Sequence, residues 1–241
     1  MKTALVGFGS MGKLVYEELG SECAVVIAPN GPDCMNNLLE YSGKIDVIID
    51  FSVPDNLNMI YEYASLNKIP VIFATTGYSE EQTAKINELS KLVPVLVSSN
   101  FSIGSILMNK FIREVTPLLS DSFDIELVET SKAKKDLRTA ATTDCILKII
   151  KKKTNLEPMY GRDNKASRAF KEIGVHSIKG GELGSSHEVM YCGDSEILSI
   201  KHTELSQSQF AEGAVDAAKW IIGKEPKLYS MEDVILSKLN K

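Results

Sequence analysis

A glycine-rich turn near the start of the chain is the feature that most limits how this sequence folds. The apolar run Thr3-Ala4-Leu5-Val6 leads directly into glycines at a G-x-G-x-x-G spacing, and an amphipathic helix is expected from Met11 to about Glu18. In dinucleotide sites the first glycine permits the tight turn, the second lets a pyrophosphate approach the backbone, and the third lets helix and strand pack closely. The spacing therefore predicts cofactor contacts from Gly7, Phe8, Gly9, Ser10, Met11 and Gly12.

The residues after this turn alternate between strand and helix patterns. Apolar runs at 23–28, 45–51, 69–73 and 93–97 indicate strands, and segments 36–41, 56–66 and 79–92 indicate helices. Near-continuous apolar strands separated by helices are typical of a parallel sheet that is covered on both faces. Because crossovers between parallel strands are right-handed, we expect a Rossmann-type, doubly wound α/β domain.

Small polar and aromatic residues follow the later strands of this predicted sheet. Ligands bind outside the carboxyl ends of such strands. One alternative is that these residues only cap the helices that follow, but three loops at equivalent positions favour a cofactor site. The predicted contacts are Phe51, Ser52, Ala74, Thr75, Thr76, Ser99, Asn100, Phe101 and Ser102.

The end of the second strand decides which dinucleotide a Rossmann domain prefers. An acidic residue there bonds the ribose of NAD, and an arginine accommodates the extra phosphate of NADP. This chain has Ala28-Pro29-Asn30 and offers neither. The choice between NADH and NADPH therefore stays open.

The pattern changes after residue 102. Helices are expected at 103–119 and 140–152, and strands at 123–129, 175–178, 188–192 and 196–202, with a mobile loop at 180–186. Alternation with one polar face indicates an open antiparallel or mixed sheet in a second, α+β domain. Helices at 208–222 and 231–239 then return to the first domain, so we predict domains of 1–102 with 208–241, and of 103–207.

Composition excludes several functional classes. The formal net charge of −5 gives no basic surface for nucleic acid, and the four cysteines lack the spacing of a zinc site or a disulfide framework. No apolar run reaches membrane-spanning length, and Met1 leads directly into the first strand. We therefore expect a soluble cytoplasmic protein with a small-molecule substrate and with no nucleic-acid or membrane partner.

The loops G-F-G-S-M-G, D-F-S-V-P, A-T-T-G-Y and S-N-F-S-I-G, followed by D-I-E-L-V-E-T and V-H-S, carry a family resemblance. Over essentially its whole length the chain resembles the dihydrodipicolinate reductase family of lysine and diaminopimelate biosynthesis. The resemblance implies hydride transfer from NADH or NADPH to a small unsaturated cyclic dicarboxylate. It also implies that the inserted sheet domain binds substrate and holds a homotetramer together.

One segment departs from the family pattern E-x-H-H-x-x-K-x-D-A-P-S-G-T-A. Ser131 and Lys132 replace the two histidines, and a one-residue deletion brings Lys134 onto the catalytic lysine. Gln207 stands where the family often has arginine. The Ser-Gly-Thr that grips a substrate carboxylate is replaced by Thr139, Ala140 and Ala141, so by resemblance these would line the substrate site together with His176.

Hydride delivery to a C–C or C=N double bond requires a cationic acid nearby. Serine cannot act as that acid, whereas Lys132 or Lys134 can if burial or neighbouring cations lower its pKa. We therefore predict catalytic roles for Lys134, Lys132 and Ser131. Two alternatives stay open: a paralogue that reduces another small imine or unsaturated acid, and a non-catalytic dinucleotide-binding protein.

The three histidines, His176, His187 and His202, lie on or beside predicted strands of the second domain. No acidic residue or cysteine accompanies them at ligand spacing, so we expect no metal site. Each ring is instead expected to donate to a backbone carbonyl.

Overall fold

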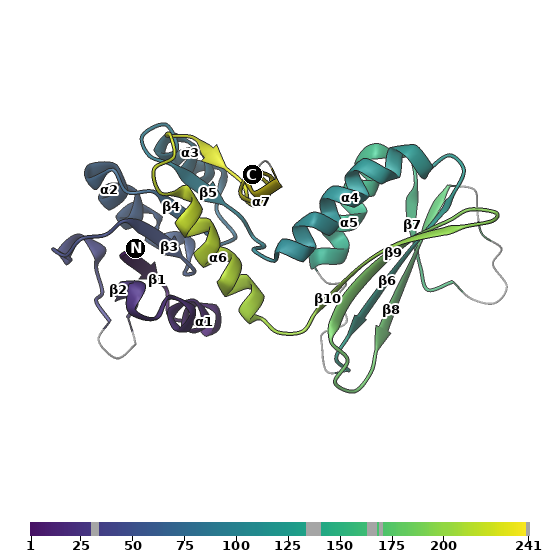
Figure 1. The fold of residues 1–241 in the computed structure, drawn as a ribbon, viewed down its shortest axis with the longest axis horizontal. Helices are drawn as coiled ribbons and strands as arrows, with labels where there is room; N and C mark the ends of the chain where they lie inside the picture. The colour runs from purple at the N-terminus through teal and green to yellow at the C-terminus, as the bar shows by residue number, and fades with distance from the viewer. Residues whose placement is uncertain (30–33, 134–140, 163–167, 169–170, 240–241) are drawn as a thin grey trace. The chain divides into compact units, whose positions relative to one another are not determined.

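The structure, a computed structural model, describes residues 1–29, 34–133, 141–162, 168 and 171–239. The chain divides into two compact units, Met1–Ile103 with Gln207–Lys241, and Gly104–Ser206. Each unit has its own sheet (Figure 1). Among the described residues, no helix is long and apolar enough to cross a membrane.

The first unit is built on a six-stranded sheet with the order β11-β5-β4-β3-β1-β2, in which all neighbours run parallel. The first strand, β1, lies inside the sheet between β3 and β2, and later strands are added on either side of it, as in other doubly wound folds. Its strands are β1 (Thr3–Val6), β2 (Cys23–Ile27), β3 (Val47–Asp50), β4 (Val71–Phe73), β5 (Val95–Val97) and β11 (Leu228–Tyr229).

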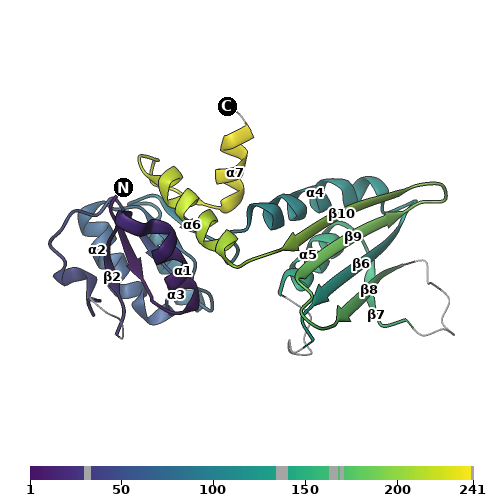
Figure 2. The same cartoon turned by 60° about the horizontal axis from the view of Figure 1, so that its bottom comes forward.

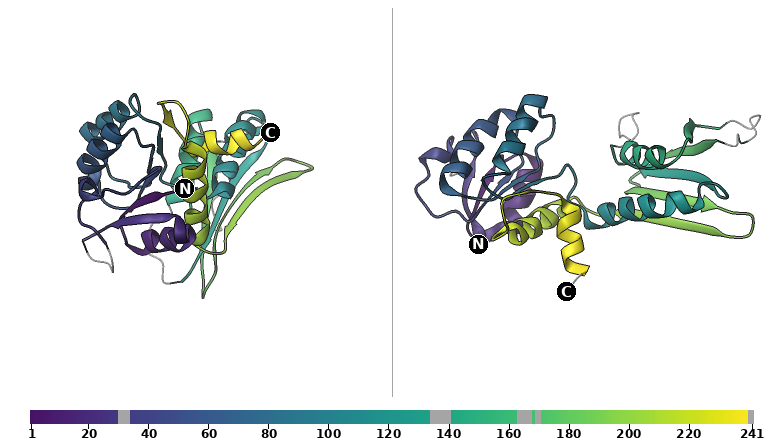
Figure 3. Two further views of the ribbon diagram at one scale, coloured as in Figure 1. Left: turned by 60° about the vertical axis from the view of Figure 1, so that its left-hand side comes forward. Right: turned by 90° about the horizontal axis from the view of Figure 1, so that it is seen from above.

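Helices cover both faces of this sheet. Ala4, Val6 and Ile48 share a buried cluster with Ile60 of α2 and Ile86 of α3, while α1 and α6 lie side by side on the other face (Figure 3). The helices are α1 (Ser10–Leu19), α2 (Leu57–Asn67), α3 (Glu80–Leu89), α6 (Ser208–Ile221) and α7 (Met231–Leu239), with short 3₁₀ turns η1 (Gly20–Glu22), η2 (Leu38–Glu40) and η3 (Pro54–Asn56). The Rossmann-type fold predicted from the sequence is confirmed.

Two details of the first unit differ from prediction. The helix expected at 36–41 is only the 3₁₀ turn η2. The Asn37 side chain caps this turn by accepting from the Leu39 N–H, and the backbone becomes extended again at Tyr41. The edge strand β11 was not predicted, since a two-residue strand is too short to produce a periodic pattern.

The second unit contains a mixed five-stranded sheet with the order β10-β9-β6-β8-β7. Strand β6 pairs antiparallel with β9 and parallel with β8, so it is the centre of the sheet. The strands are β6 (Asp124–Ser131), β7 (Glu157–Tyr160), β8 (Glu172–Lys179), β9 (Ser185–Cys192) and β10 (Ile197–Glu204). This is the α+β unit with an open mixed sheet that the sequence predicted.

Two helices, α4 (Ile103–Leu119) and α5 (Ala141–Lys153), cover one face of this sheet (Figure 2). Ile112 of α4 and Ile150 of α5 belong to one buried cluster with Leu127 and Val175 of the sheet. Leu127 and Val175 therefore point toward the helices. Because side chains alternate along a strand, Val128 and His176 point to the opposite face.

Two predictions for the second unit are wrong in detail. The loop expected at 180–186 ends earlier, because Ser185 and Ser186 begin β9, where the Ser186 hydroxyl lies 2.8 Å from that of Thr130. Strand β7 was missed, since it is a short, largely exposed edge strand that contains Pro158. Proline is tolerated at such an edge because no ladder hydrogen bond is lost there.

A buried hydrogen bond between Tyr191 and Thr116 lies in the core of the second unit. Tyr191 is 0% exposed and its hydroxyl lies 2.7 Å from Thr116 Oγ1, which in turn donates to the Ile112 carbonyl. Tyr191→Phe should lower the free energy of unfolding by about 1 kcal/mol in urea denaturation, because a buried hydrogen bond is lost without creating a cavity. The control Tyr160→Phe, at a 53% exposed residue, should change it by less than about 0.5 kcal/mol. Equal effects of the two substitutions would contradict this assignment.

Candidate functional site

The glycine-rich turn has the geometry that its spacing predicts. Gly7 follows β1 with a φ of +96°, and a Cβ there would lie 2.2 Å from the Phe51 carbonyl oxygen. A Cβ on Gly12 would lie 2.3 Å from the Gly7 carbonyl oxygen, whereas one on Gly9 would meet nothing within 4 Å. The first and third glycines are therefore required by close backbone contacts, and the second leaves open space.

The start of α1 can accept an anion. Gly9 is the N-cap residue and supplies no side-chain hydrogen bond, and the first turn of α1 carries no acidic residue. The backbone N–H groups and the positive end of the helix dipole at such a terminus favour phosphate groups. This arrangement fits the pyrophosphate of a dinucleotide.

The loops after β3, β4 and β5 emerge next to one another, because these strands are adjacent and parallel. Hydrogen bonds tie neighbouring loops: the Ala74 N–H donates to the Asp50 carbonyl at 2.9 Å, and the Ser52 N–H donates to Thr75 Oγ1 at 2.9 Å. The Ser98 N–H likewise donates to the Phe73 carbonyl at 3.0 Å. The structure therefore brings together the loops that carry the predicted cofactor contacts.

The predicted cofactor residues differ in what they present to solvent. Thr75, Phe101 and Ser102 are buried, with Phe101 2% exposed and its ring 5.7 Å from that of Phe51. For these buried residues only the backbone is suited to face a ligand. Gly9, Ser10, Thr76 and Ser99 are exposed, and Gly7, Phe8, Met11, Phe51, Ser52, Ala74 and Asn100 are partly exposed.

Asp50 is a buried carboxyl group at the centre of these loops, and sequence reasoning did not single it out. It is 0% exposed, and it accepts hydrogen bonds from the Ser52 N–H at 3.1 Å and from the Tyr78 hydroxyl at 2.9 Å. Burial raises the pKa of Asp50, and hydrogen bonds from Ser52, Thr75 and Tyr78 partly offset that rise. An aspartate that ends an otherwise apolar strand, V-I-I-D, is the signal that the sequence contained.

The altered family segment begins at the end of β6. Ser131 is buried and its carbonyl accepts from the Gly180 N–H at 3.2 Å. Lys132 is exposed and its Nζ lies 2.6 Å from Glu182 Oε2, so it lacks the burial that an acid role requires. Ala141 is the first residue of α5, whereas Lys134, Thr139 and Ala140 lie outside the described residues.

A second buried carboxylate, Glu129, lies on β6 two residues before Ser131. It is 4% exposed and accepts hydrogen bonds from the hydroxyl of Thr143 on α5 and, at 2.6 Å, from that of Ser177 on β8. Glu129 therefore joins the start of α5 to two strands of the sheet, next to the altered segment.

His176 lies apart from this group. Its Nε2 is 2.7 Å from Glu126 Oε2, so the prediction that this ring donates to a backbone carbonyl is wrong. It points to the face opposite Ser177 and lines a cavity of about 620 Å³ with Tyr160 and Ile178, so the structure does not bring it to Ser131. In the described parts of the chain, no group of three or more His, Cys, Asp or Glu residues is arranged to hold a metal ion.

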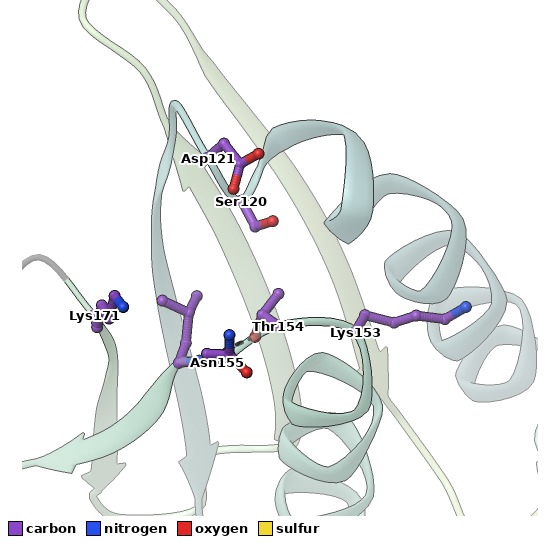
Figure 4. A pocket seen from close by; sticks show the side chains of 7 residues that line it. Ser120, Asp121, Lys153, Thr154, Asn155 and Lys171 are labelled. Atoms are coloured by element: carbon purple, nitrogen blue, oxygen red, sulfur yellow. Dashed lines mark hydrogen bonds between the residues drawn. The ribbon is translucent and has the colours of Figure 1, made fainter.

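Another cavity, of about 300 Å³, lies where α4 and α5 end (Figure 4). It is lined by Asp121, Lys153, Asn155 and Lys171, among others. Strand β6 begins beside it at Asp124 and runs to Ser131 at its far end. This cavity is therefore not part of the predicted site.

Comparisons with known proteins support the assignment suggested by the turn, the loops and the altered segment. Family models described as the N-terminus and the C-terminus of dihydrodipicolinate reductase match residues 1–101 and 104–235. The chain belongs to the dihydrodipicolinate reductase family. As a member of it, the chain is an NAD(P)H-dependent reductase.

Relatives are similar over nearly the whole chain. A 4-hydroxy-tetrahydrodipicolinate reductase from Clostridium novyi (strain NT) is 40% identical over 243 residues, covering 95% of this chain and 96% of that protein. One from Brachyspira hyodysenteriae is 38% identical and covers 98% of this chain and 100% of that protein. Dipicolinate-bound dihydrodipicolinate reductase from Paenisporosarcina sp. TG-14 has the same fold, with a TM-score of 0.80 and 19% identity over 95% of this chain and 97% of that one.

Alanine substitutions at two glycines of the turn, Gly9 and Gly12, should have separable effects. At Gly9 a Cβ meets nothing and the φ of −73° suits alanine, so Gly9→Ala should keep the unfolding midpoint. It should weaken NADH and NADPH binding more than about tenfold, because the new methyl group occupies the space where a pyrophosphate approaches the backbone. Gly12→Ala should instead lower stability by about 1–3 kcal/mol through its clash with the Gly7 carbonyl. Thermal unfolding and fluorescence titration of each variant distinguish the two effects, and wild-type affinity in Gly9→Ala would contradict the assignment.

Proposed function

We propose that this protein catalyses the lysine-pathway step for which its relatives are named, the reduction of 4-hydroxy-tetrahydrodipicolinate. The observation that supports this most is the open space at Gly9, where α1 begins without a side-chain cap. The loops after β3 and β4, which are hydrogen-bonded to each other, belong to the same unit. The names of full-length relatives at 40% and 38% identity supply the substrate. In this proposal the first unit binds the dinucleotide and the second binds substrate.

The cofactor is NADH or NADPH, which supplies a hydride when bound. The start of α1 would hold the pyrophosphate through Gly9 and Ser10. The loops after β3, β4 and β5 hold the nicotinamide side through Ser52, Thr76 and Asn100. Because packing fixes the buried residues of these loops, little conformational entropy is lost when the exposed residues bind the cofactor.

The acid that completes the reduction is Lys134, whereas the exposed, paired Lys132 and the uncharged Ser131 are not suited to that role. Hydride transfer leaves negative charge on the substrate, and a nearby ammonium group stabilises or protonates it. Thr139, Ala140 and Ala141 are the proposed substrate contacts, whereas His176 points to the other face of the sheet and is not one of them. Glu129 fixes the start of α5 against β6 and β8, which positions the segment that carries these residues.

A second candidate is a reductase for another small imine or unsaturated acid. Two observations favour it: Ser131 and Lys132 stand where the family has two histidines, and Lys132 is paired with Glu182.

We also propose that the protein is a cytoplasmic homotetramer held together by the sheet of the second unit. Exposed apolar side chains on the strands of that sheet, Ile178 and Ile197, support an interface there. Light scattering after size-exclusion chromatography tests the oligomeric state.

The function is tested by following the oxidation of NADH and of NADPH with substrate made in situ by dihydrodipicolinate synthase from pyruvate and aspartate semialdehyde. Turnover within about a hundredfold of the usual range of roughly 1 to 10³ per second is expected. Lys134→Ala should lower kcat by about 10² or more, as loss of a general acid does. Lys132→Ala is the matched control, and because its ammonium group is exposed and paired it should cost less than about tenfold. Cofactor binding without turnover would reject the lysine-pathway substrate and favour the second candidate.

A further inference from the structure

Asp50 ends β3 as a carboxyl group that is fully buried beneath the proposed cofactor loops. Its Oδ1 accepts from the Ser52 N–H at 3.1 Å and from the Ser52 hydroxyl at 2.5 Å, and its Oδ2 accepts from the Tyr78 hydroxyl at 2.9 Å. Ser52 belongs to the loop after β3, and Tyr78 to the loop after β4. One carboxyl group thus joins the two loops.

The bonds around Asp50 continue on both sides. The Ser52 N–H also donates to Thr75 Oγ1 at 2.9 Å, and the Ser52 hydroxyl accepts from Asn56 Nδ2 at 2.9 Å. The Tyr78 ring packs edge-on against Phe73, with centroids 6.0 Å apart, which fixes the direction of its hydroxyl. Ser52, Thr75 and Tyr78 are therefore held in one network with Asp50 at its centre.

Burying a carboxyl group is costly unless donors satisfy it. An apolar residue ending β3 would pack without that cost, so the fold alone does not require an acid here. The bonds of Asp50 instead fix the two loops whose partly exposed Ser52 and exposed Thr76 are proposed to contact the cofactor. What this buried carboxyl group supplies is the relative position of those loops.

We infer that Asp50 is a positioning residue for dinucleotide binding, whose carboxylate holds the loop after β3 against the loop after β4 through Ser52 and Tyr78. The inference rests on the proposed cofactor site of the first unit. It concerns binding affinity, and it does not depend on which substrate the enzyme reduces.

Ionisation of Asp50 links this position to pH. The groups that interact with it are Ser52, Thr75 and Tyr78. Burial and the Asp50 charge raise the pKa of Tyr78, so the phenol stays protonated and remains a donor. Burial raises the pKa of Asp50 itself, so on acidification this carboxyl group is protonated earlier than an ordinary aspartate. A protonated carboxyl group gives up one acceptor position, and cofactor affinity should fall as the pH falls through that raised pKa.

The test compares Asp50→Asn and Tyr78→Phe with two matched controls in the full-length protein. Asp46→Asn changes an aspartate just before the other end of β3, which accepts from the Lys2 N–H at 2.7 Å and pairs with Lys44. Tyr229→Phe removes a tyrosine hydroxyl bond, 3.0 Å to the Glu225 carbonyl, at the edge strand β11 of the same sheet. NADH and NADPH binding is measured by fluorescence titration from about pH 5 to about pH 8, a range in which ordinary aspartates stay ionised, together with thermal unfolding.

Asp50→Asn keeps an oxygen for Ser52 and an amide that Tyr78 can accept from, so it should bind within about tenfold of wild type near neutral pH. It should lose the acid-side fall in affinity. Tyr78→Phe should bind about tenfold more weakly throughout, since one hydrogen bond to the carboxylate is gone. Both controls should keep the affinity and the pH profile of wild type.

Wild-type affinity and pH profile in both Asp50→Asn and Tyr78→Phe would overturn the inference, even if their unfolding midpoints fall. A wild-type protein that binds neither dinucleotide would overturn the inference and the proposed function together. Binding that follows the expected pattern without turnover on the lysine-pathway substrate would reject the proposed function alone and support the role of Asp50.

Discussion

The contact on which the first unit depends is the close backbone approach around Gly7. The Gly7 carbonyl faces Gly12 on α1, and the Gly7 Cα faces the Phe51 carbonyl at the end of β3. A side chain at position 7 or 12 would separate the strand-to-helix turn from its neighbours, because the clashing atoms belong to backbone that cannot rotate away. The start of α1, the end of β1 and the loop after β3 are consequently fixed together, and this places the positive end of α1 beside the polar loops.

Each unit has a buried, hydrogen-bonded carboxyl group next to its proposed site. Asp50 and Glu129 are both buried carboxyl groups near the carboxyl ends of strands, and hydroxyl groups from other elements donate to both. Such donors satisfy the carboxyl group while they fix a loop in the first unit and a helix start in the second. In the first unit this hydrogen bonding begins where the apolar strand β3 ends, and in the second it begins within β6.

The sequence predicted the features that come from periodicity and from backbone sterics. Apolar runs located strands β1 to β5 of the first sheet, and the glycine spacing predicted the close backbone packing at Gly7 and Gly12. It failed where the pattern is short or the contact is distant. β7 and β11 are short edge strands without alternation, and the bond from His176 to Glu126 joins residues fifty positions apart. Asp50 was missed because a single polar residue after an apolar strand has no period, and its partner Tyr78 comes from another loop.

The altered segment of the second unit begins on a regular scaffold. The Ser131 carbonyl accepts from Gly180, and the Ala133 N–H donates to the Gly181 carbonyl at 3.1 Å, so the chain leaves β6 in register with the turn before β9. Ser131 and Lys132 therefore stand on backbone positions that the sheet determines, and the departure from the family lies in their side-chain chemistry. The buried serine carries no charge, and the exposed, paired lysine is not a desolvated cation. In the proposed mechanism the acid must then come from Lys134. The substrate that this enzyme accepts depends on whether fewer cationic groups can still bind it.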